Sequence, residues 1–109
     1  MMSRLKVLIG ALAVASGVTG VAYAFSGQKV DQSALQFSQQ TVKLHKGETL
    51  VFSNSDRTSH NITVSGGSME FDGGLQKPGQ DLEVPFTAAG TYKVTCGIHP
   101  KMAMTVTVE

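Results

Sequence analysis

Cysteine is almost absent from this chain, since Cys96 is the single one among 109 residues. One cysteine cannot form an internal disulfide, so the fold is not one of the disulfide scaffolds that small exported domains often use. A buried, unreactive thiol is the simplest alternative for a lone cysteine. In an oxidising compartment, however, a free thiol beside a surface loop is exposed to oxidation unless something occupies it. The scarcity of cysteine therefore favours a bound group at Cys96.

Strong charge of either sign is also lacking. The chain has nine Lys and Arg against eight Asp and Glu, and two of these cations, Arg4 and Lys6, lie near its start. The other cations stand singly along the sequence. Binding of nucleic acid or of an anionic membrane requires a clustered positive face. We therefore expect neither kind of partner.

The N-terminus has the pattern of an export signal. Arg4 and Lys6 precede an uncharged, mostly apolar run, Val7–Val21, and small residues follow at Ala22 and Ala24. The run is about 15 residues long, whereas a membrane-spanning helix needs roughly 20, so a retained anchor is the less favoured alternative. We predict a signal peptide over residues 1–24 that is cleaved after Ala24, and one soluble domain over residues 25–109.

No helical period of apolar residues occurs after residue 24. Apolar residues alternate instead in short runs, as in Leu50 and Phe52 or in Val106 and Val108. Glycine-rich turns separate these runs at intervals of roughly 8–12 residues, which is typical of an antiparallel β-sandwich of about seven or eight strands. We expect residues 25–32 to form a polar tail before the first strand.

Three different metal donors lie within one short segment: the thiolate of Cys96, the imidazole of His99 and the thioether of Met102. His60 lies upstream on a separate strand pattern, in phase with Ile62, so we expect its side chain to point inward. A lone inward histidine is more often a core residue than a ligand, but this one accompanies three further donors. Two His, one Cys and a weak Met form the donor set of a trigonal electron-transfer copper site.

Zinc binding and catalysis fit these donors less well. A structural zinc site takes four Cys or His ligands, whereas the chain has one Cys and three His in total. With four side-chain donors, no position stays open for a substrate or an activated water. A nucleophile and base formed by Cys96 and His99 would lack a nearby orienting carboxylate. We expect no enzyme activity.

Two further residues that could bind a metal are given structural interpretations instead. His45 lies in the outward phase of its strand, which predicts a solvent-exposed side chain. Met104 alternates with Val106 and Val108, which predicts a place in the core.

The donor segment gives the chain a resemblance to the cupredoxins, the small blue copper proteins. Its Cys-x-x-His-x-x-Met spacing, with Pro100 after the histidine, is most similar to that of the amicyanins, whereas plastocyanins and pseudoazurins have a longer spacing between His and Met. The resemblance extends to Ser59-His60-Asn61 and to Ala88-Ala89-Gly90-Thr91-Tyr92. It departs at Ile98, where many members of the family have proline.

The resemblance implies a Greek-key β-sandwich with one copper ion per chain, bound by His60, Cys96, His99 and Met102. It implies that hydrogen bonds of Asn61 tie the loop of the first ligand to the Cys96 loop. It also implies a periplasmic, monomeric carrier of single electrons that docks near His99 with redox proteins, such as a donor dehydrogenase and a c-type cytochrome acceptor. Copper binding for tolerance or delivery is the alternative function.

Overall fold

The computed structural model describes residues 24–109, which form nine strands and no helix. Accordingly, no described segment is a helix that could cross a membrane. The predicted signal peptide lies outside the described residues, apart from Ala24. The strands are β1 (Ala24–Ser33), β2 (Gln36–Phe37), β3 (Thr41–Leu44), β4 (Glu48–Asn54), β5 (Ile62–Gly66), β6 (Met69–Asp72), β7 (Asp81–Pro85), β8 (Gly90–Cys96) and β9 (Ala103–Val108).

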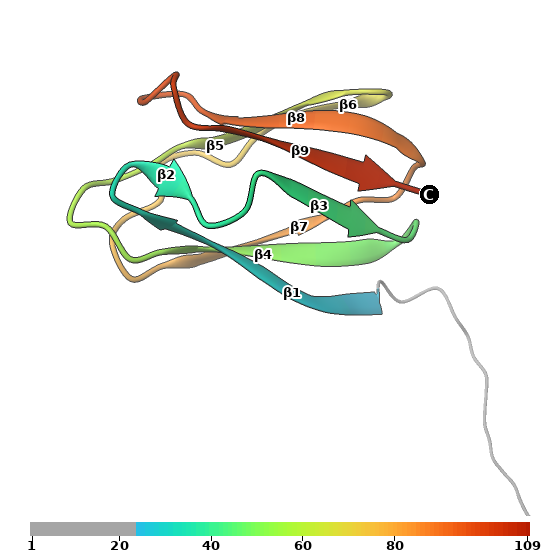
Figure 1. Cartoon of the computed structure of the whole chain (residues 1–109), viewed down its shortest axis with the longest axis horizontal. Helices are drawn as coiled ribbons and strands as arrows, with labels where there is room; N and C mark the ends of the chain where they lie inside the picture. The colour runs from blue at the N-terminus through green and yellow to red at the C-terminus, as the bar shows by residue number, and fades with distance from the viewer. Residues whose placement is uncertain (1–23) are drawn as a thin grey trace, which may run out of the picture.

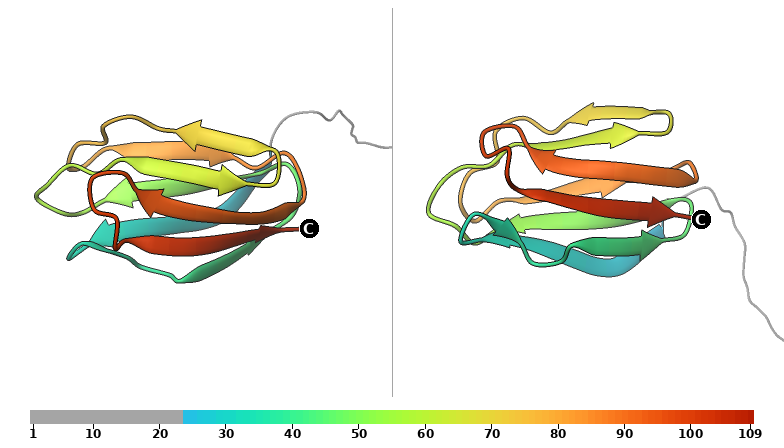
Figure 2. Two further views of the ribbon diagram at one scale, coloured as in Figure 1. Left: turned by 90° about the horizontal axis from the view of Figure 1, so that it is seen from above. Right: turned by 45° about the horizontal axis from the view of Figure 1, so that its top comes forward.

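The strands form two sheets that pack face to face (Figures 1 and 2). One sheet has the order β2-β1-β4-β7 and the other the order β3-β9-β8-β5-β6. The pairs β1·β4 and β3·β9 are parallel, and the other pairs are antiparallel. The predicted all-β sandwich is confirmed, but the described residues form nine strands where seven or eight were predicted, and the predicted purely antiparallel pairing is wrong. Its sheets are mixed, because long connections between the sheets let two neighbouring strands run in the same direction.

The prediction of a polar tail over residues 25–32 is wrong, because this segment lies within β1. Its backbone pairs with β4, where Val30 lies opposite Phe52 and Gln32 lies opposite Asn54. Val30 and Gln32 are fully buried. Polar residues dominate the segment, so backbone pairing with β4 creates a strand that hydrophobic alternation does not reveal.

Elsewhere the predicted alternation gives the correct inward faces. In β3, for example, Val42 and Leu44 are buried while Thr41 and Lys43 are exposed. His45 is exposed and Met104 is buried in the core, as predicted. The buried hydrophobic core between the sheets consists of Val30, Phe37, Val42, Leu44, Leu50, Phe52, Ile62, Val64, Val84, Phe86, Tyr92, Val94, Cys96, Met102, Met104, Val106 and Val108.

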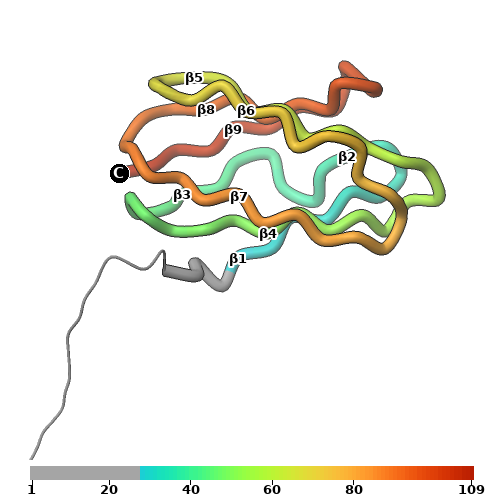
Figure 3. Tube along the Cα trace, turned by 180° about the vertical axis from the view of Figure 1, so that it is seen from behind, coloured from blue at the N-terminus to red at the C-terminus, as the bar shows by residue number. Residues whose placement is uncertain are grey.

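Three connections meet at one end of the sandwich, opposite the end where the C-terminus lies (Figures 1 and 3). They are the β1–β2 turn at residues 34–35, the β4–β5 connection at residues 55–61 and the β8–β9 connection at residues 97–102. All four predicted metal donors lie in these connections or at the adjoining end of β8.

Candidate metal centre

The end of β8 and the segment before β5 bring Cys96 and His60 together. Cys96 is the last residue of β8 and lies opposite Ile62 of β5. His60 forms an isolated bridge with Gln76 just before β5 begins. The inward phase predicted for both residues is confirmed, since Cys96 is 1% and His60 is 0% exposed.

The donor atoms of Cys96, His60 and His99 form a compact triangle. The thiol Sγ lies 3.6 Å from the Nδ1 atom of His60 and 3.6 Å from the Nδ1 atom of His99. The two Nδ1 atoms lie 3.2 Å apart. The middle of this triangle is about 2 Å from each corner, close to the distance between a metal ion and an imidazole nitrogen. The residues present therefore fit a single metal ion.

The β8–β9 connection holds His99 and Met102 close to Cys96 through main-chain hydrogen bonds. The N–H of His99 donates to the carbonyl of Cys96 at 3.2 Å, and the N–H of Met102 donates to the carbonyl of His99 at 2.9 Å. The N–H of Cys96 donates to the carbonyl of Met102 at 3.3 Å. His99 is half-buried and Met102 is buried. The chain thus turns tightly here and returns the thioether residue beneath the surface.

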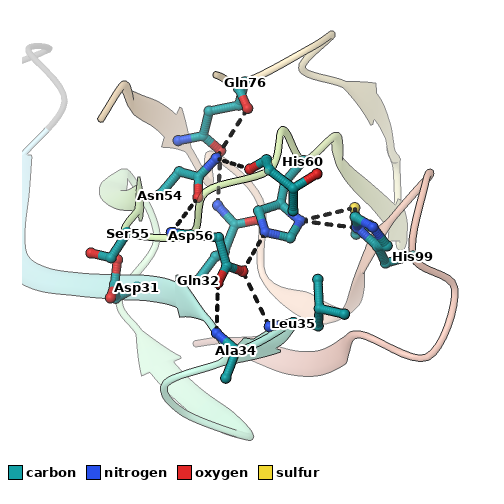
Figure 4. A network of polar contacts seen from close by, with 12 residues as sticks. Asp31, Gln32, Ala34, Leu35, Asn54, Ser55, Asp56, His60, Gln76 and His99 are labelled. Carbon is teal, nitrogen blue, oxygen red and sulfur yellow. Dashed lines mark hydrogen bonds and ion pairs between the residues drawn. The ribbon is translucent and has the colours of Figure 1, made fainter. Parts of the chain in front are cut away.

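Asp56 sets the orientation of the His60 ring. The Oδ2 atom of Asp56 lies 2.7 Å from Nε2 of His60, on the side of the ring away from His99 (Figure 4). A carboxylate only accepts hydrogen bonds, so the ring proton belongs on Nε2. Nδ1 then carries a free lone pair that points into the donor triangle, as a metal ligand requires.

The same carboxylate accepts two main-chain hydrogen bonds. The N–H of Ala34 donates to Oδ1 at 2.7 Å, and the N–H of Leu35 donates to Oδ2 at 3.1 Å. Burial alone would raise the pKa of Asp56, but the hydrogen bonds from His60, Leu35 and Ala34 outweigh burial and lower the pKa below its ordinary value. Asp56 is therefore ionised at neutral pH.

A buried polar network holds the main chain of His60. The N–H of His60 donates to the carbonyl of Gln76 at 2.9 Å, and the N–H of Gln76 donates back at 2.7 Å. The Gln76 side chain donates to the carbonyls of Phe52 and Gln80 and accepts from the amide of Gln32. These bonds anchor the His60 segment to β1 and β4 (Figure 4).

Asn61 links the two ligand segments through its main chain. Its N–H donates to Sγ of Cys96 at 3.3 Å, and its carbonyl accepts from the N–H of Gly97 at 2.8 Å. The Asn61 side chain donates instead to Asp72 at 2.7 Å and to the carbonyl of Gly74 at 3.0 Å. The predicted tie between the two loops is confirmed, and the main chain of Asn61 forms it. The Asn61 side chain instead holds the end of β6 and the β6–β7 connection.

An open hollow of about 530 Å³ lies beside the donor triangle. Leu35, Ile98, His99, Pro100 and Met102 are among the residues that line it. Leu35 is 50% and Ile98 is 49% exposed. The lining also includes Gln36 and Lys101 but is mostly apolar, and it contains the one histidine of the triangle that reaches solvent.

The sandwich and its buried Cys and His donors define a class of small metal-binding β-proteins. The family described as "Copper binding proteins, plastocyanin/azurin family" matches residues 25–109. The chain therefore belongs to this copper-binding family, the cupredoxins, whose members are electron carriers, and its cofactor is copper.

Individual proteins of this family resemble the chain over most of its length. Amicyanin-alpha of Methylorubrum extorquens is 27% identical over 84 residues, which cover 74% of this chain and 71% of that protein. Chloroplastic plastocyanin of Chlamydomonas reinhardtii is 32% identical, with 68% and 57% covered. Amicyanin of Paracoccus denitrificans is 31% identical, with 73% and 63% covered. The chain thus spans less than two thirds of the latter two proteins.

Solved structures show the same relationship. A reduced Cu(I) form of an amicyanin mutant at pH 4 has a TM-score of 0.71 and 28% sequence identity, with 79% of this chain and 85% of that chain covered. A copper-containing nitrite reductase from Thermus scotoductus has a TM-score of 0.70 at 24% identity, but only 22% of that chain is covered. The second match shows a shared fold alone.

Sequence reasoning missed the residues that support His60. Asp56 precedes His60 by four positions, and this spacing was the only available signal. In a loop, a four-residue spacing does not determine how far apart two side chains lie, so the contact between Asp56 and His60 could not be inferred. Gln76 lies far from His60 in the sequence and meets it through an isolated bridge, and Gln32 reaches this pair through its hydrogen bond to Gln76.

Proposed function

We propose that this chain is a periplasmic blue copper protein that carries one electron at a time. In this proposal one copper ion is bound by His60, Cys96, His99 and Met102. The observation that carries the assignment is the triangle of Sγ and two Nδ1 atoms, with separations of 3.6, 3.6 and 3.2 Å. A thiolate and two imidazoles suit copper, and a weak thioether completes the set.

The surrounding residues favour electron transfer because they hold the donors still. A bound copper ion supplies the one-electron couple between Cu(I) and Cu(II). Asp56 keeps the His60 ring in one orientation, and Asn61 donates a hydrogen bond to the Cys96 sulfur. With the donors fixed by hydrogen bonds, little rearrangement accompanies the gain or loss of an electron. All ligands are side chains, so the site offers no position for a substrate and the chain is not an enzyme in this proposal.

The electron enters and leaves through His99 in this proposal. His99 is the half-buried member of the triangle, and the apolar hollow lies beside it. Apolar surface around a redox group suits brief docking of other proteins, since it needs no specific ion pairs. The partners are a donor such as a dehydrogenase and an acceptor such as a c-type cytochrome, and the chain acts as a monomer.

We further propose that residues 1–24 are a signal peptide cleaved after Ala24, which leaves residues 25–109 as a single exported copper domain. The family match over residues 25–109 supports this boundary. Mass spectrometry of the protein from a periplasmic extract tests it. A mature N-terminus at Phe25 is expected, and a retained leader would contradict the proposal.

Electron exchange separates this function from copper tolerance or delivery. We expect the copper-loaded protein to cycle reversibly between its two oxidation states and to keep its metal in the presence of a Cu(I) chelator of moderate affinity. A protein that releases Cu(I) readily to such a chelator and exchanges electrons slowly would support delivery instead. Voltammetry and chelator competition on the same sample give both results.

A further inference from the structure

The β1–β2 turn has a backbone conformation that its residues do not favour. Ser33 pairs with Gln36, so Ala34 and Leu35 form a two-residue hairpin loop. Both have positive φ, 54° for Ala34 and 58° for Leu35, and no other non-glycine residue in the described part of the chain does. Such loops normally contain Asn-Gly or a similar pair, because a Cβ atom disfavours this conformation. Something outside the turn must stabilise it.

Asp56 supplies this stabilisation. Its two oxygens accept the N–H groups of Ala34 and Leu35, at 2.7 and 3.1 Å, and the side chain is only 13% exposed. Hydrogen bonds to an ionised acceptor are about twice as strong as neutral ones. The Oδ2 atom that accepts from Leu35 also lies 2.7 Å from Nε2 of His60. One carboxylate therefore contacts the turn and a donor of the metal centre at once (Figure 4).

The turn forms one wall of the apolar hollow. Leu35 and Ile98 expose about half of their side chains and line the hollow together with His99. Leu35 occupies this place with the turn in its left-handed conformation, which the two hydrogen bonds to Asp56 support. The position of Leu35 beside His99 thus depends on Asp56.

We propose that Asp56 is a positioning residue with two roles: it orients His60 and it holds the Ala34–Leu35 turn so that Leu35 completes the docking surface around His99. This inference rests on the proposed electron-transfer function. It adds that Leu35 determines how well a redox partner fits. It also adds that one carboxylate, that of Asp56, supports both a copper ligand and the shape of the docking surface.

Electron self-exchange between two copies of the copper-loaded protein tests the role of Leu35 without an identified partner. Leu35→Gly keeps the turn, because glycine accepts positive φ, but removes the apolar side chain. We expect the self-exchange rate, measured by NMR line broadening in mixtures of the two oxidation states, to fall about fivefold or more while the visible spectrum stays unchanged. Leu75→Gly is the matched control, since Leu75 is 61% exposed and does not line the hollow, and its rate should equal that of the wild type.

Asp56→Asn tests the shared carboxylate. Asparagine has one acceptor oxygen, so it cannot keep all three contacts. In the full chain, with Cu(I) bound and without copper, we expect hydrogen exchange to accelerate about tenfold or more at whichever of three protons lose their acceptor: the Ala34 amide, the Leu35 amide and the proton on Nε2 of His60. A tenfold change corresponds to the loss of roughly one hydrogen bond. The self-exchange rate should fall as in Leu35→Gly. Asp31→Asn is the control, because Asp31 accepts from Ser53 and Ser55 and contacts neither His60 nor the turn.

Adding Ala34→Gly to Asp56→Asn separates positioning from general loss of structure. Glycine at position 34 relieves the strain of the turn but adds no acceptor for His60, so the self-exchange rate should recover while the proton on Nε2 of His60 exchanges as in Asp56→Asn alone. Unchanged amide exchange in Asp56→Asn, or an unchanged self-exchange rate in Leu35→Gly, would overturn the inference. If Asp56→Asn does not fold, Leu35→Gly and its control still decide the docking role. Absence of a thiolate band in the wild type would instead overturn the proposed function.

Discussion

The two sides of the metal centre are built in opposite ways. The β8–β9 side takes Cys96, His99 and Met102 from one short segment that closes on itself through main-chain hydrogen bonds. The His60 side depends on Asp56 and on Gln76, which bring in β1, β4 and the β6–β7 connection. Three of the proposed donors thus come from one compact segment, whereas the residues that support the fourth donor, His60, come from distant parts of the fold. Substitutions on the two sides should therefore differ in what they damage.

The largest loss of stability should follow a substitution on the His60 side of the metal centre. Gln76→Leu removes three side-chain hydrogen bonds, two of them buried, and leaves the carbonyl of Phe52 and the amide of Gln32 without these partners. We expect the free energy of unfolding to fall by about 2–4 kcal/mol. Urea denaturation of the metal-free chain measures it. Gln39→Leu at an exposed position is the control and should change stability by less than about 0.5 kcal/mol; an equally small change in Gln76→Leu would contradict the role of the network.

Gly97→Ala should disturb the contact between the two sides. A Cβ atom at position 97 would lie 2.5 Å from Oδ1 of Asn61, so the Asn61 side chain must move away from Asp72 and Gly74. We expect a loss of about 1–3 kcal/mol in the free energy of unfolding. A double-mutant cycle with Asn61→Ala checks the cause, because removing Oδ1 should relieve the clash. Strict additivity of the two substitutions would show that the clash is not with Asn61.

The two buried methionines should respond differently. Met104→Leu is nearly volume-conserving and should cost less than about 1.5 kcal/mol, with the visible spectrum unchanged. Met102→Gln should keep copper bound but lower the reduction potential, because a thioether favours Cu(I) more than an amide oxygen does. Voltammetry and absorption spectra distinguish them. A shift of potential in Met104→Leu and none in Met102→Gln would make Met104 the ligand.

The smallest predicted effect is on the stability of the fold at acidic pH, and it comes from Asp72. Hydrogen bonds from Asn61 and from the N–H of Gly74 lower the pKa of Asp72 below its ordinary value. The unfolded chain then binds a proton more readily than the folded one, so the contribution of Asp72 is present above about pH 4 and is lost as the pH falls through the folded pKa. Asp72→Asn should flatten the fall of the urea midpoint between about pH 4 and pH 2 relative to the wild type. An identical pH profile in the variant would contradict this contribution.

Hydrophobic alternation predicted the sandwich and the inward faces of its strands, including those of Cys96 and His60. It failed for β1, where polar residues pair with β4. The parallel pairings could not be predicted either, because alternation defines which face is buried but not which strand lies beside which.

The donors could be predicted because their types are chemically distinctive and three of them lie close together in the sequence. Asp56 and Gln76 have ordinary polar side chains, and only the folded chain places them against His60. The strained conformation of Ala34 and Leu35 was equally hidden, since neither residue favours positive φ.

The visible absorption spectrum of the purified protein with Cu(II) tests the central assignment most directly. We predict one copper ion per chain and an intense thiolate-to-copper charge-transfer band that gives a blue or green colour, and we predict that Cys96→Ser loses this band because an alcohol cannot replace the thiolate. Wild-type protein that binds Cu(II) at full occupancy without colour, or a band that survives in Cys96→Ser, would contradict the assignment of Cys96 as a copper ligand.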